Sequence, residues 1–254
     1  MKQTIESEKD FLLRLQAEIS ARIESLSDSD TVKPEKPVNA YKTVILIDCG
    51  HGGFSKETGY ATAPAKMCRH IGKELHNGPD FYEGVFNRIV GKKLAQKLAA
   101  AGIPFRYISE PIADISLTER TNRANIINLE EKAKGRKTVY FSIHGNAAGN
   151  GGPQSSAQGF SVFVHTGASN DSRAIAEKLG ENVRKILPEM QYRYWKSGIG
   201  YWESNLHVLR ETTMPAILSE NGFFDHNKEV LEMFSESFTD KIAEAHFQTA
   251  LNLQ

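Results

Sequence analysis

Apolar runs typical of strands alternate with amphipathic segments typical of helices, and this alternation limits the fold more than any other feature of the chain. The apolar runs predict strands at 43–48, 104–109, 137–143, 159–165 and 215–220. Helical periodicity predicts helices at 83–101, 117–133, 171–187 and 228–252, the last with a break. Such alternation is typical of a sheet on which helices pack. We therefore expect an α/β fold with a single open, mostly parallel or mixed sheet and helices on both faces.

The N-terminal segment stands apart from this pattern. Residues 1–27 predict an amphipathic helix whose apolar stripe consists of Leu12, Leu15, Ile19, Ile23 and Leu26. Either this helix docks on the main domain, or it forms a short coiled coil that gives weak self-association. Residues 28–41 are polar, contain two prolines and are interpreted as a linker. The main domain then spans residues 42–254.

Charge and composition argue against several classes of partner. Lysine and arginine total 31, as do aspartate and glutamate, so the formal net charge is zero and favours neither nucleic acid nor an anionic membrane. Two cysteines argue against a disulfide scaffold. No apolar run approaches a transmembrane length, and the N-terminus lacks the apolar segment of a signal peptide. We expect a chain made in the cytoplasm and not inserted in a membrane.

Polar side chains follow three of the predicted strands. His51 comes just after the first strand, His144 after the third, and Glu220 at the end of the last. In open α/β sheets, ligand sites lie at the carboxyl ends of the strands. A further carboxylate, Glu83, stands at the start of the predicted helix that follows the long loop. Two imidazoles and two carboxylates can form a catalytic zinc site. Each residue alone has an ordinary alternative, because a histidine can be solvated and either glutamate can belong to a helix start or a turn.

A segment of roughly thirty residues separates the first predicted strand from this helix. Residues 50–82 contain six glycines and show no regular periodicity. Loops of this length are uncommon inside a domain unless they are functional or disordered. The loop begins at the predicted site, and glycines beside His51 let other groups approach closely.

Several motifs in their order resemble one family. The chain contains "IDCGHGG", "YEGVFNRIVGKKLAQKLAAAG", "LTERTNRAN", "FSIHGNA", "GFSVFVHTGAS" and "LHVLRETTMPAILSENGFFDHNKE". This series resembles the zinc-dependent N-acetylmuramoyl-L-alanine amidases of the Amidase_3 type. The resemblance runs from about Val44 to the C-terminus, so it makes residues 42–254 a zinc amidase catalytic domain.

The resemblance assigns roles to the residues at the strand ends. It implies one Zn²⁺ per chain, held by His51, Glu83 and His144, and a catalytic glutamate at Glu220. Three further residues are candidate substrate contacts: Asn146, His207 and Arg210. His207 stands on a predicted strand or the approach to one, and a packed core histidine is an equal alternative.

Three positions depart from the family pattern without removing a predicted ligand. The family usually has proline at Cys49, alanine at Gly145 and threonine or a similar residue at Asn221. Cys49 is interpreted as a small buried residue, with a further metal contact as the alternative. Some members carry an inhibitory helix in the segment that corresponds to residues 147–158, which is short and glycine-rich here. We therefore expect an active site that needs no activator protein.

The resemblance implies hydrolysis of the amide between the lactyl group of N-acetylmuramic acid and L-alanine in peptidoglycan. Two alternatives stay open: a zinc amidohydrolase for a different amide, and a non-catalytic peptidoglycan-binding module. The biological setting is either a phage or prophage endolysin or a host remodelling enzyme. The chain would act on the cell wall after release as a lysin, or after export if a leader was removed.

Overall fold

The computed structural model describes residues 41–62, 66–68, 80–149, 156–194 and 199–254. The predicted N-terminal helix over residues 1–27 and the linker up to residue 40 lie outside the described residues. The strands of the main sheet are β1 (Thr43–Cys49), β6 (Phe105–Tyr107), β7 (Lys137–Asn146), β8 (Phe160–Val164), β9 (Trp202–Glu203) and β10 (Ala216–Phe223). The helices are α2 (Glu83–Ala100), α3 (Leu117–Ala133), α4 (Asn170–Ile186), α5 (His207–Arg210), α6 (Glu229–Met233) and α7 (Glu236–Leu251).

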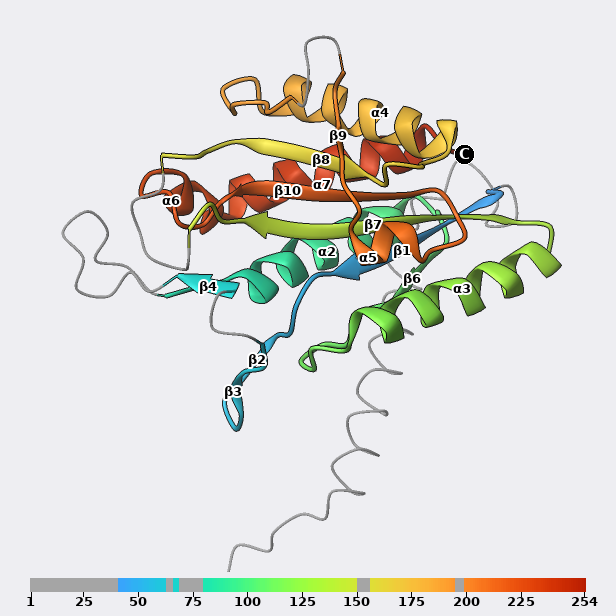
Figure 1. Cartoon of the computed structure of the whole chain (residues 1–254), viewed down its shortest axis with the longest axis horizontal. Helices are drawn as coiled ribbons and strands as arrows, with labels where there is room; N and C mark the ends of the chain where they lie inside the picture. Colours follow the sequence, from blue (N-terminus) through green and yellow to red (C-terminus); the bar gives the residue numbers. More distant parts are fainter. Residues whose placement is uncertain (1–40, 63–65, 69–79, 150–155, 195–198) are drawn as a thin grey trace, which may run out of the picture. The chain divides into compact units, whose positions relative to one another are not determined.

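The six strands form one mixed sheet in the order β6-β1-β7-β10-β8-β9 (Figure 1). The strands β6, β1, β7 and β10 run parallel to one another, whereas β8 pairs antiparallel with β10. The helices that connect the parallel strands are needed because a parallel pair cannot be joined by a tight turn. The predicted α/β class and the mixed sheet are confirmed.

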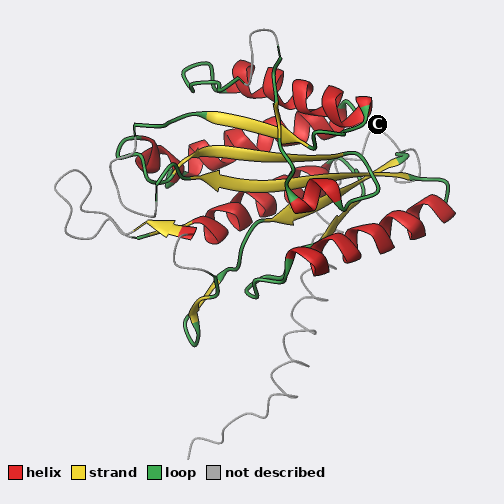
Figure 2. Ribbon diagram, in the orientation of Figure 1, coloured by secondary structure: helices red, strands yellow, loops and turns green. Residues whose placement is uncertain are grey.

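Helices cover both faces of the sheet (Figure 2). The side chains of β1 alternate between two hydrophobic cores: Ile45 and Ile47 belong to one, Val44 and Leu46 to the other. The first core contains buried residues of α2, α4 and α7, and the second contains residues of α3 and α5. Because β1 is buried on both faces, it consists almost entirely of apolar residues until it reaches its carboxyl end.

The break predicted in the helix over 228–252 is confirmed. The segment divides into α6 and α7, and the Ser235 hydroxyl caps α7 by accepting a hydrogen bond from the Phe238 amide. The prediction that His207 stands on a strand or its approach is wrong, because His207 begins the one-turn helix α5. A helix of four residues is too short to show helical periodicity in the sequence. The apolar residues around His207, which are Leu206, Val208 and Leu209, are therefore equally compatible with a strand.

The long segment after β1 contains two small strand pairs. β2 (Phe54–Ser55) pairs antiparallel with β3 (Gly59–Tyr60), and β4 (Met67–Cys68) pairs antiparallel with β5 (Phe81–Tyr82). β5 ends directly before α2, so the described parts of the loop lead into the helix that begins at Glu83. Among the described residues, no helix is both long and apolar enough to cross a membrane.

Candidate metal centre

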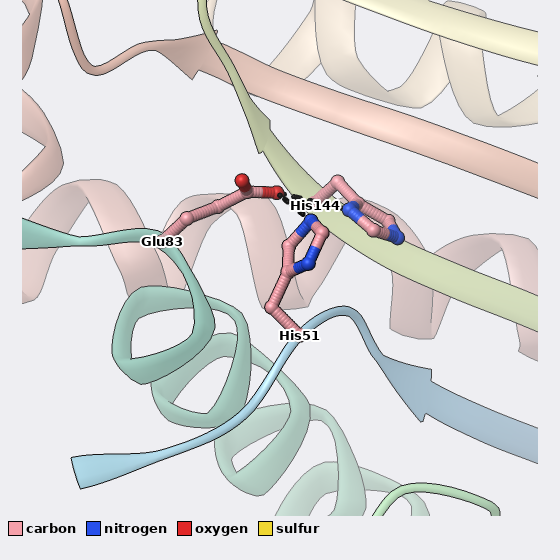
Figure 3. A group of neighbouring side chains, drawn as sticks. All are labelled: His51, Glu83 and His144. Carbon is pink, nitrogen blue, oxygen red and sulfur yellow. Dashed lines mark hydrogen bonds and ion pairs between the residues drawn. The ribbon is translucent and has the colours of Figure 1, made fainter. Parts of the chain in front are cut away.

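Three side chains meet at the carboxyl edge of the sheet, and we call them the metal-site cluster: His51, Glu83 and His144 (Figure 3). His51 follows β1, His144 lies near the end of β7, and Glu83 is the first residue of α2. Glu83 Oε1 lies 2.9 Å from His144 Nδ1 and 3.2 Å from His51 Nε2. The two imidazole rings stand edge to face with centroids 5.1 Å apart. All three therefore present a ligand atom to one small volume.

The spacing of these atoms fits a tetrahedral metal. Nitrogen and oxygen ligands lie about 2.0–2.1 Å from zinc, which places neighbouring ligand atoms about 3.3 Å apart. The ligand atoms of the cluster all lie within 4.8 Å of one another. Two imidazoles and one carboxylate also match the donor sets of catalytic zinc sites, which leave the fourth position to water or substrate. The residues present therefore fit a zinc ion.

The backbone at His51 adopts an unusual conformation. His51 has φ 61°, in the left-handed region that residues other than glycine rarely occupy. Its carbonyl accepts hydrogen bonds from Arg88 Nη2 at 2.7 Å and from Arg120 Nη2 at 3.2 Å. The preceding Gly50 carbonyl accepts one from the Asn87 amide at 3.0 Å. These bonds hold a strained turn in place and direct the imidazole toward Glu83.

Two glycines allow the elements of the site to approach each other. A Cβ at Gly50 would lie 2.0 Å from Cε1 of His144, and one at Gly84 would lie 1.8 Å from the Gly52 carbonyl oxygen. Neither position can carry a side chain without moving a metal-site residue or the start of α2. These two glycines thus allow close packing of the residues of the metal-site cluster.

The metal-site cluster carries negative charge beside its two imidazoles. Burial alone would raise the pKa of Glu83, but hydrogen bonds with His144 and His51 overcome burial and lower it to about 2. Burial would lower the pKa of His144, yet the hydrogen bond with Glu83 raises it above its usual value. The cluster therefore keeps an ionised carboxylate in a buried position, which favours a cation.

Glu220 lies beside the cluster on the neighbouring strand. It pairs in register with His144 across β10 and β7, and adjacent strands are about 4.8 Å apart. Its Oε2 atom is buried without a hydrogen-bond partner. Burial is the largest effect on Glu220 and raises the pKa of its carboxyl group to about 7. The charge of His144 lowers this pKa, the charge of Glu83 raises it, and the charge of Lys66 lowers it. A carboxyl group with this pKa can both accept and release a proton near neutral pH.

A cavity of about 360 Å³ opens beside the metal-site cluster. Its lining includes His51, His144, Glu220 and His207. The Nε2 atom of His207 is buried without a partner. Asn146 lies at the end of β7, where its side-chain oxygen accepts a hydrogen bond from the Ala147 amide. The structure therefore brings His207 to the cavity together with the predicted metal ligands and Glu220.

Arg210, the third candidate substrate contact, lies on the exposed side of α5. Its guanidinium donates hydrogen bonds to the Asn205 side chain at 2.9 Å and to Glu211 at 2.7 Å. It does not line the cavity that contains His207. The short helix thus separates two of the candidate contacts, because His207 and Arg210 occupy its two ends.

A second polar group lies beside the cavity, and we call it the Asp48 network: Asp48, Arg120, Tyr140 and Ser142. Two of its members, Asp48 and Arg120, belong to the cavity lining. Asp48 Oδ1 accepts a hydrogen bond from Arg120 at 2.5 Å, and Oδ2 accepts bonds from the Tyr140 and Ser142 hydroxyls at 2.6 and 3.2 Å. All four residues are buried. The contacts of Arg120 with Asp48 and His51 join residues about seventy positions apart, so no sequence pattern links them.

The three departures from the family pattern have structural explanations. Cys49 is buried against Gly91 of α2, and burial raises its thiol pKa to about 12, which supports its interpretation as a packing residue. A Cβ at Gly145 would lie 3.1 Å from Cε of Met233. The Asn221 amide donates a hydrogen bond to the His144 carbonyl at 2.9 Å and so supports the strand that carries this predicted ligand.

Comparison with solved structures defines the class of protein. The fold matches the crystal structure of N-acetylmuramoyl-L-alanine amidase from Clostridium difficile 630 with a TM-score of 0.61 and 29% identity, over 84% of this chain and 96% of that chain. It also matches the amidase AmiC2 of Nostoc punctiforme with a TM-score of 0.63 at 22% identity, over 83% and 96% of the two chains. This second likeness concerns the fold alone.

Sequence comparison identifies the family. Residues 45–252 match the family model of Amidase_3, described as N-acetylmuramoyl-L-alanine amidase. The chain therefore belongs to the Amidase_3 family, which confirms the resemblance of its motifs.

Among curated relatives, N-acetylmuramoyl-L-alanine amidase CwlM of Bacillus licheniformis is 32% identical over 132 residues, 52% of this chain and 44% of CwlM. The endolysin of Bacillus phage SPP1 is 25% identical over 208 residues, 80% of this chain and 63% of the endolysin. A sporulation-specific amidase of Bacillus subtilis (strain 168) is 27% identical over 215 residues, 83% of this chain and 69% of that protein. The alignment with CwlM thus spans less than half of that relative's length.

Proposed function

We propose that this chain is a zinc-dependent N-acetylmuramoyl-L-alanine amidase that hydrolyses the amide between the lactyl group of N-acetylmuramic acid and L-alanine in peptidoglycan. The observation that carries the proposal is the convergence of His51, Glu83 and His144 on one point, with Glu220 on the adjacent strand. Membership of the Amidase_3 family supports the choice of bond. The convergence of ligands supports one zinc ion per chain.

In this proposal His51 Nε2, His144 Nδ1 and one Glu83 oxygen hold the zinc ion. A zinc ion held by these residues would polarise a carbonyl and would lower the pKa of a water molecule to about 7. The carbonyl of His51 stays fixed by Arg88 and Arg120, so the imidazole keeps its direction when substrate enters. The fixed turn therefore supplies a ligand whose position is set before binding.

Glu220 is the proposed general base and acid. Its unpartnered Oε2 accepts a proton from the attacking water and then delivers it to the amine of L-alanine as the C–N bond breaks. A pKa of about 7 in the protein without metal places the group in the range in which both transfers are efficient.

His207 is a proposed substrate contact, because its unpartnered Nε2 belongs to a side chain that lines the cavity. We also propose Asn146, at the end of β7, and Arg210, at the exposed end of α5, as substrate contacts. We further propose activity without an activator protein, on the sequence of residues 147–158. Weak self-association through residues 1–27 also stays a proposal.

The relatives include both an endolysin and a sporulation-specific amidase. We propose the endolysin setting for this chain, with action on the cell wall after release from the cytoplasm. A host remodelling enzyme that acts after export is the second setting, and the B. subtilis relative supports it.

The test is an incubation of the purified chain with peptidoglycan, with and without a chelator. The proposal expects new L-alanine amino termini, no new reducing sugar ends, and loss of activity with chelator that zinc restores. Bound zinc without new amino termini would contradict it and would favour a different amide substrate or a non-catalytic binding module. Activity that appears only after a second protein is added would contradict the absence of an activator.

A further inference from the structure

Arg120 lines the cavity beside the metal-site cluster, and each of its side-chain N–H groups already donates a hydrogen bond within the protein. Arg120 has five N–H groups, and they donate to Ile115, Asp48, Cys49, His51 and Asp114. Its side chain is only 3% exposed. Arg120 therefore has no hydrogen to offer a substrate, although it lines the cavity.

Lys66 is the second cation in the cavity lining, and its situation differs. Across the described part of the chain, the structure pairs Lys66 Nζ with no carboxylate. The nearby Asp114 is already paired with Arg120 at 3.1 Å. The Oε2 atom of Glu220 is buried without any hydrogen-bond partner, so Lys66 does not bind that atom. An ammonium group beside a cavity, with all its donors available, suits an anionic group of a ligand.

The backbone of Lys66 is fixed to the start of α2. The Tyr60 hydroxyl donates a hydrogen bond to the Lys66 carbonyl at 2.8 Å and accepts one from the Gly84 amide at 2.9 Å. Met67, the next residue, pairs with Tyr82 across β4 and β5. Because Glu83 lies between Tyr82 and Gly84, these contacts tie Lys66 to the element that supplies a metal ligand. The backbone of Lys66 thus has a defined place relative to the metal-site cluster.

We infer that Lys66 recognises the free α-carboxylate of the second stem-peptide residue, so that the enzyme prefers stems with D-isoglutamate over stems with the carboxamide D-isoglutamine. This inference rests on the proposed amidase function. The second residue follows the L-alanine whose amine is released, and two extended residues span at most about 7 Å. The carboxylate on this residue is the negative charge nearest to the scissile amide on the peptide side. A carboxamide has the same shape but no charge for the ammonium group.

The experiment compares two glycan-strand substrates that differ only in this carboxylate or carboxamide. For the wild-type chain with zinc, we expect kcat/KM to be on the order of tenfold higher for the carboxylate substrate, mainly through KM. Lys66→Gln should lose this preference by lowering kcat/KM for the carboxylate substrate alone. Lys66→Arg should retain the preference. Lys56→Gln, which removes an exposed lysine from the same loop, is the matched control and should change neither substrate.

The outcomes separate this inference from the function on which it rests. Equal wild-type kcat/KM for both substrates would overturn the role of Lys66 and leave the amidase function intact. An equal loss on both substrates in Lys66→Gln, with a shifted pH profile, would also overturn it, because Lys66 would then act through Glu220. Failure of the wild-type chain to cut either substrate would refute the amidase function and the inference together. Zinc content and melting temperature should match the wild type in all three variants.

Discussion

The metal-site cluster and the Asp48 network are adjacent polar groups at the same edge of the sheet, yet they differ in how their atoms are satisfied. In the Asp48 network, the carboxylate oxygens accept three hydrogen bonds and every N–H of Arg120 has an acceptor. In the metal-site cluster, one carboxylate oxygen faces two imidazole nitrogens, and Glu220 nearby has an unpartnered oxygen. A network whose hydrogen bonds are all made within the protein stabilises the fold. A group of acceptor atoms that exceeds the available donors indicates a site for a bound cation.

The sharpest test of this comparison removes one predicted ligand. His144→Ala should lose bound zinc and all measurable amidase activity, because two remaining ligands hold the ion poorly. Metal content by mass spectrometry and turnover of peptidoglycan are the measurements. The circular dichroism spectrum should stay that of a folded protein, since the Asp48 network is intact. Wild-type zinc content in this variant would exclude His144 as a ligand.

The second largest effect concerns Glu220. Glu220→Gln should keep one zinc per chain and lower kcat by about 10²–10⁴-fold, because the amide keeps the shape of the side chain but cannot accept the proton. Zinc content and kcat are measured on the same preparation. The control is Glu203→Gln, at a half-exposed glutamate that pairs with Arg173 away from the cavity. A near-normal kcat in Glu220→Gln would show that another group acts as the base.

Asp48→Asn should mainly affect stability, which separates the Asp48 network from the metal-site cluster. Arg120 is buried and would keep only the more exposed Asp114 as a charged partner, which costs about 3 kcal/mol in the free energy of unfolding. The control is Asp114→Asn, which removes the more exposed partner of the same guanidinium and should cost less than about 1 kcal/mol. Urea unfolding measures both. Equal effects of the two variants would contradict the distinction between buried and exposed partners.

These two polar groups also show what could be predicted from the sequence. The alternation of apolar strands with helices predicted the sheet, and the polar ends of those strands placed His51, His144 and Glu220 together, because parallel strands end at one edge. The carbonyl bonds from Arg88 and Arg120 could not be predicted, since they depend on a left-handed turn at His51. Lys66 lies in a segment without periodicity, so nothing in the sequence linked it to the cavity.

A fully buried histidine outside the metal-site cluster, His246, extends the comparison to pH. His246 Nδ1 lies 2.8 Å from the Ile242 carbonyl and must donate to it, so Nε2 accepts a hydrogen bond from the Ser219 hydroxyl at 2.9 Å. Unlike the imidazoles of the metal-site cluster, this one is satisfied by the protein. Burial lowers the pKa of His246 to about 4, so protonation favours the unfolded chain.

The stability that neutral His246 gives is complete above its unfolded pKa of about 6.5 and is lost as the pH falls toward 4. Between pH 7.5 and pH 5 the wild type should lose about 2 kcal/mol more than His246→Gln. Urea unfolding of both proteins with zinc at each pH gives this difference, because the titration of His51, Glu83 and His144 is common to both and cancels. Parallel pH profiles for the two proteins would contradict the lowered pKa.

The smallest effect is expected for Tyr140→Phe. The Tyr140 hydroxyl donates to Asp48 Oδ2 at 2.6 Å, and its loss should cost about 1.5 kcal/mol, because Ser142 still donates to the same oxygen. Urea unfolding measures the cost, and zinc content and kcat should stay at wild-type values. A stability loss as large as that of Asp48→Asn would mean that the tyrosine, rather than the ion pair with Arg120, dominates the network. Loss of zinc would instead show that the Asp48 network and the metal-site cluster act as one unit.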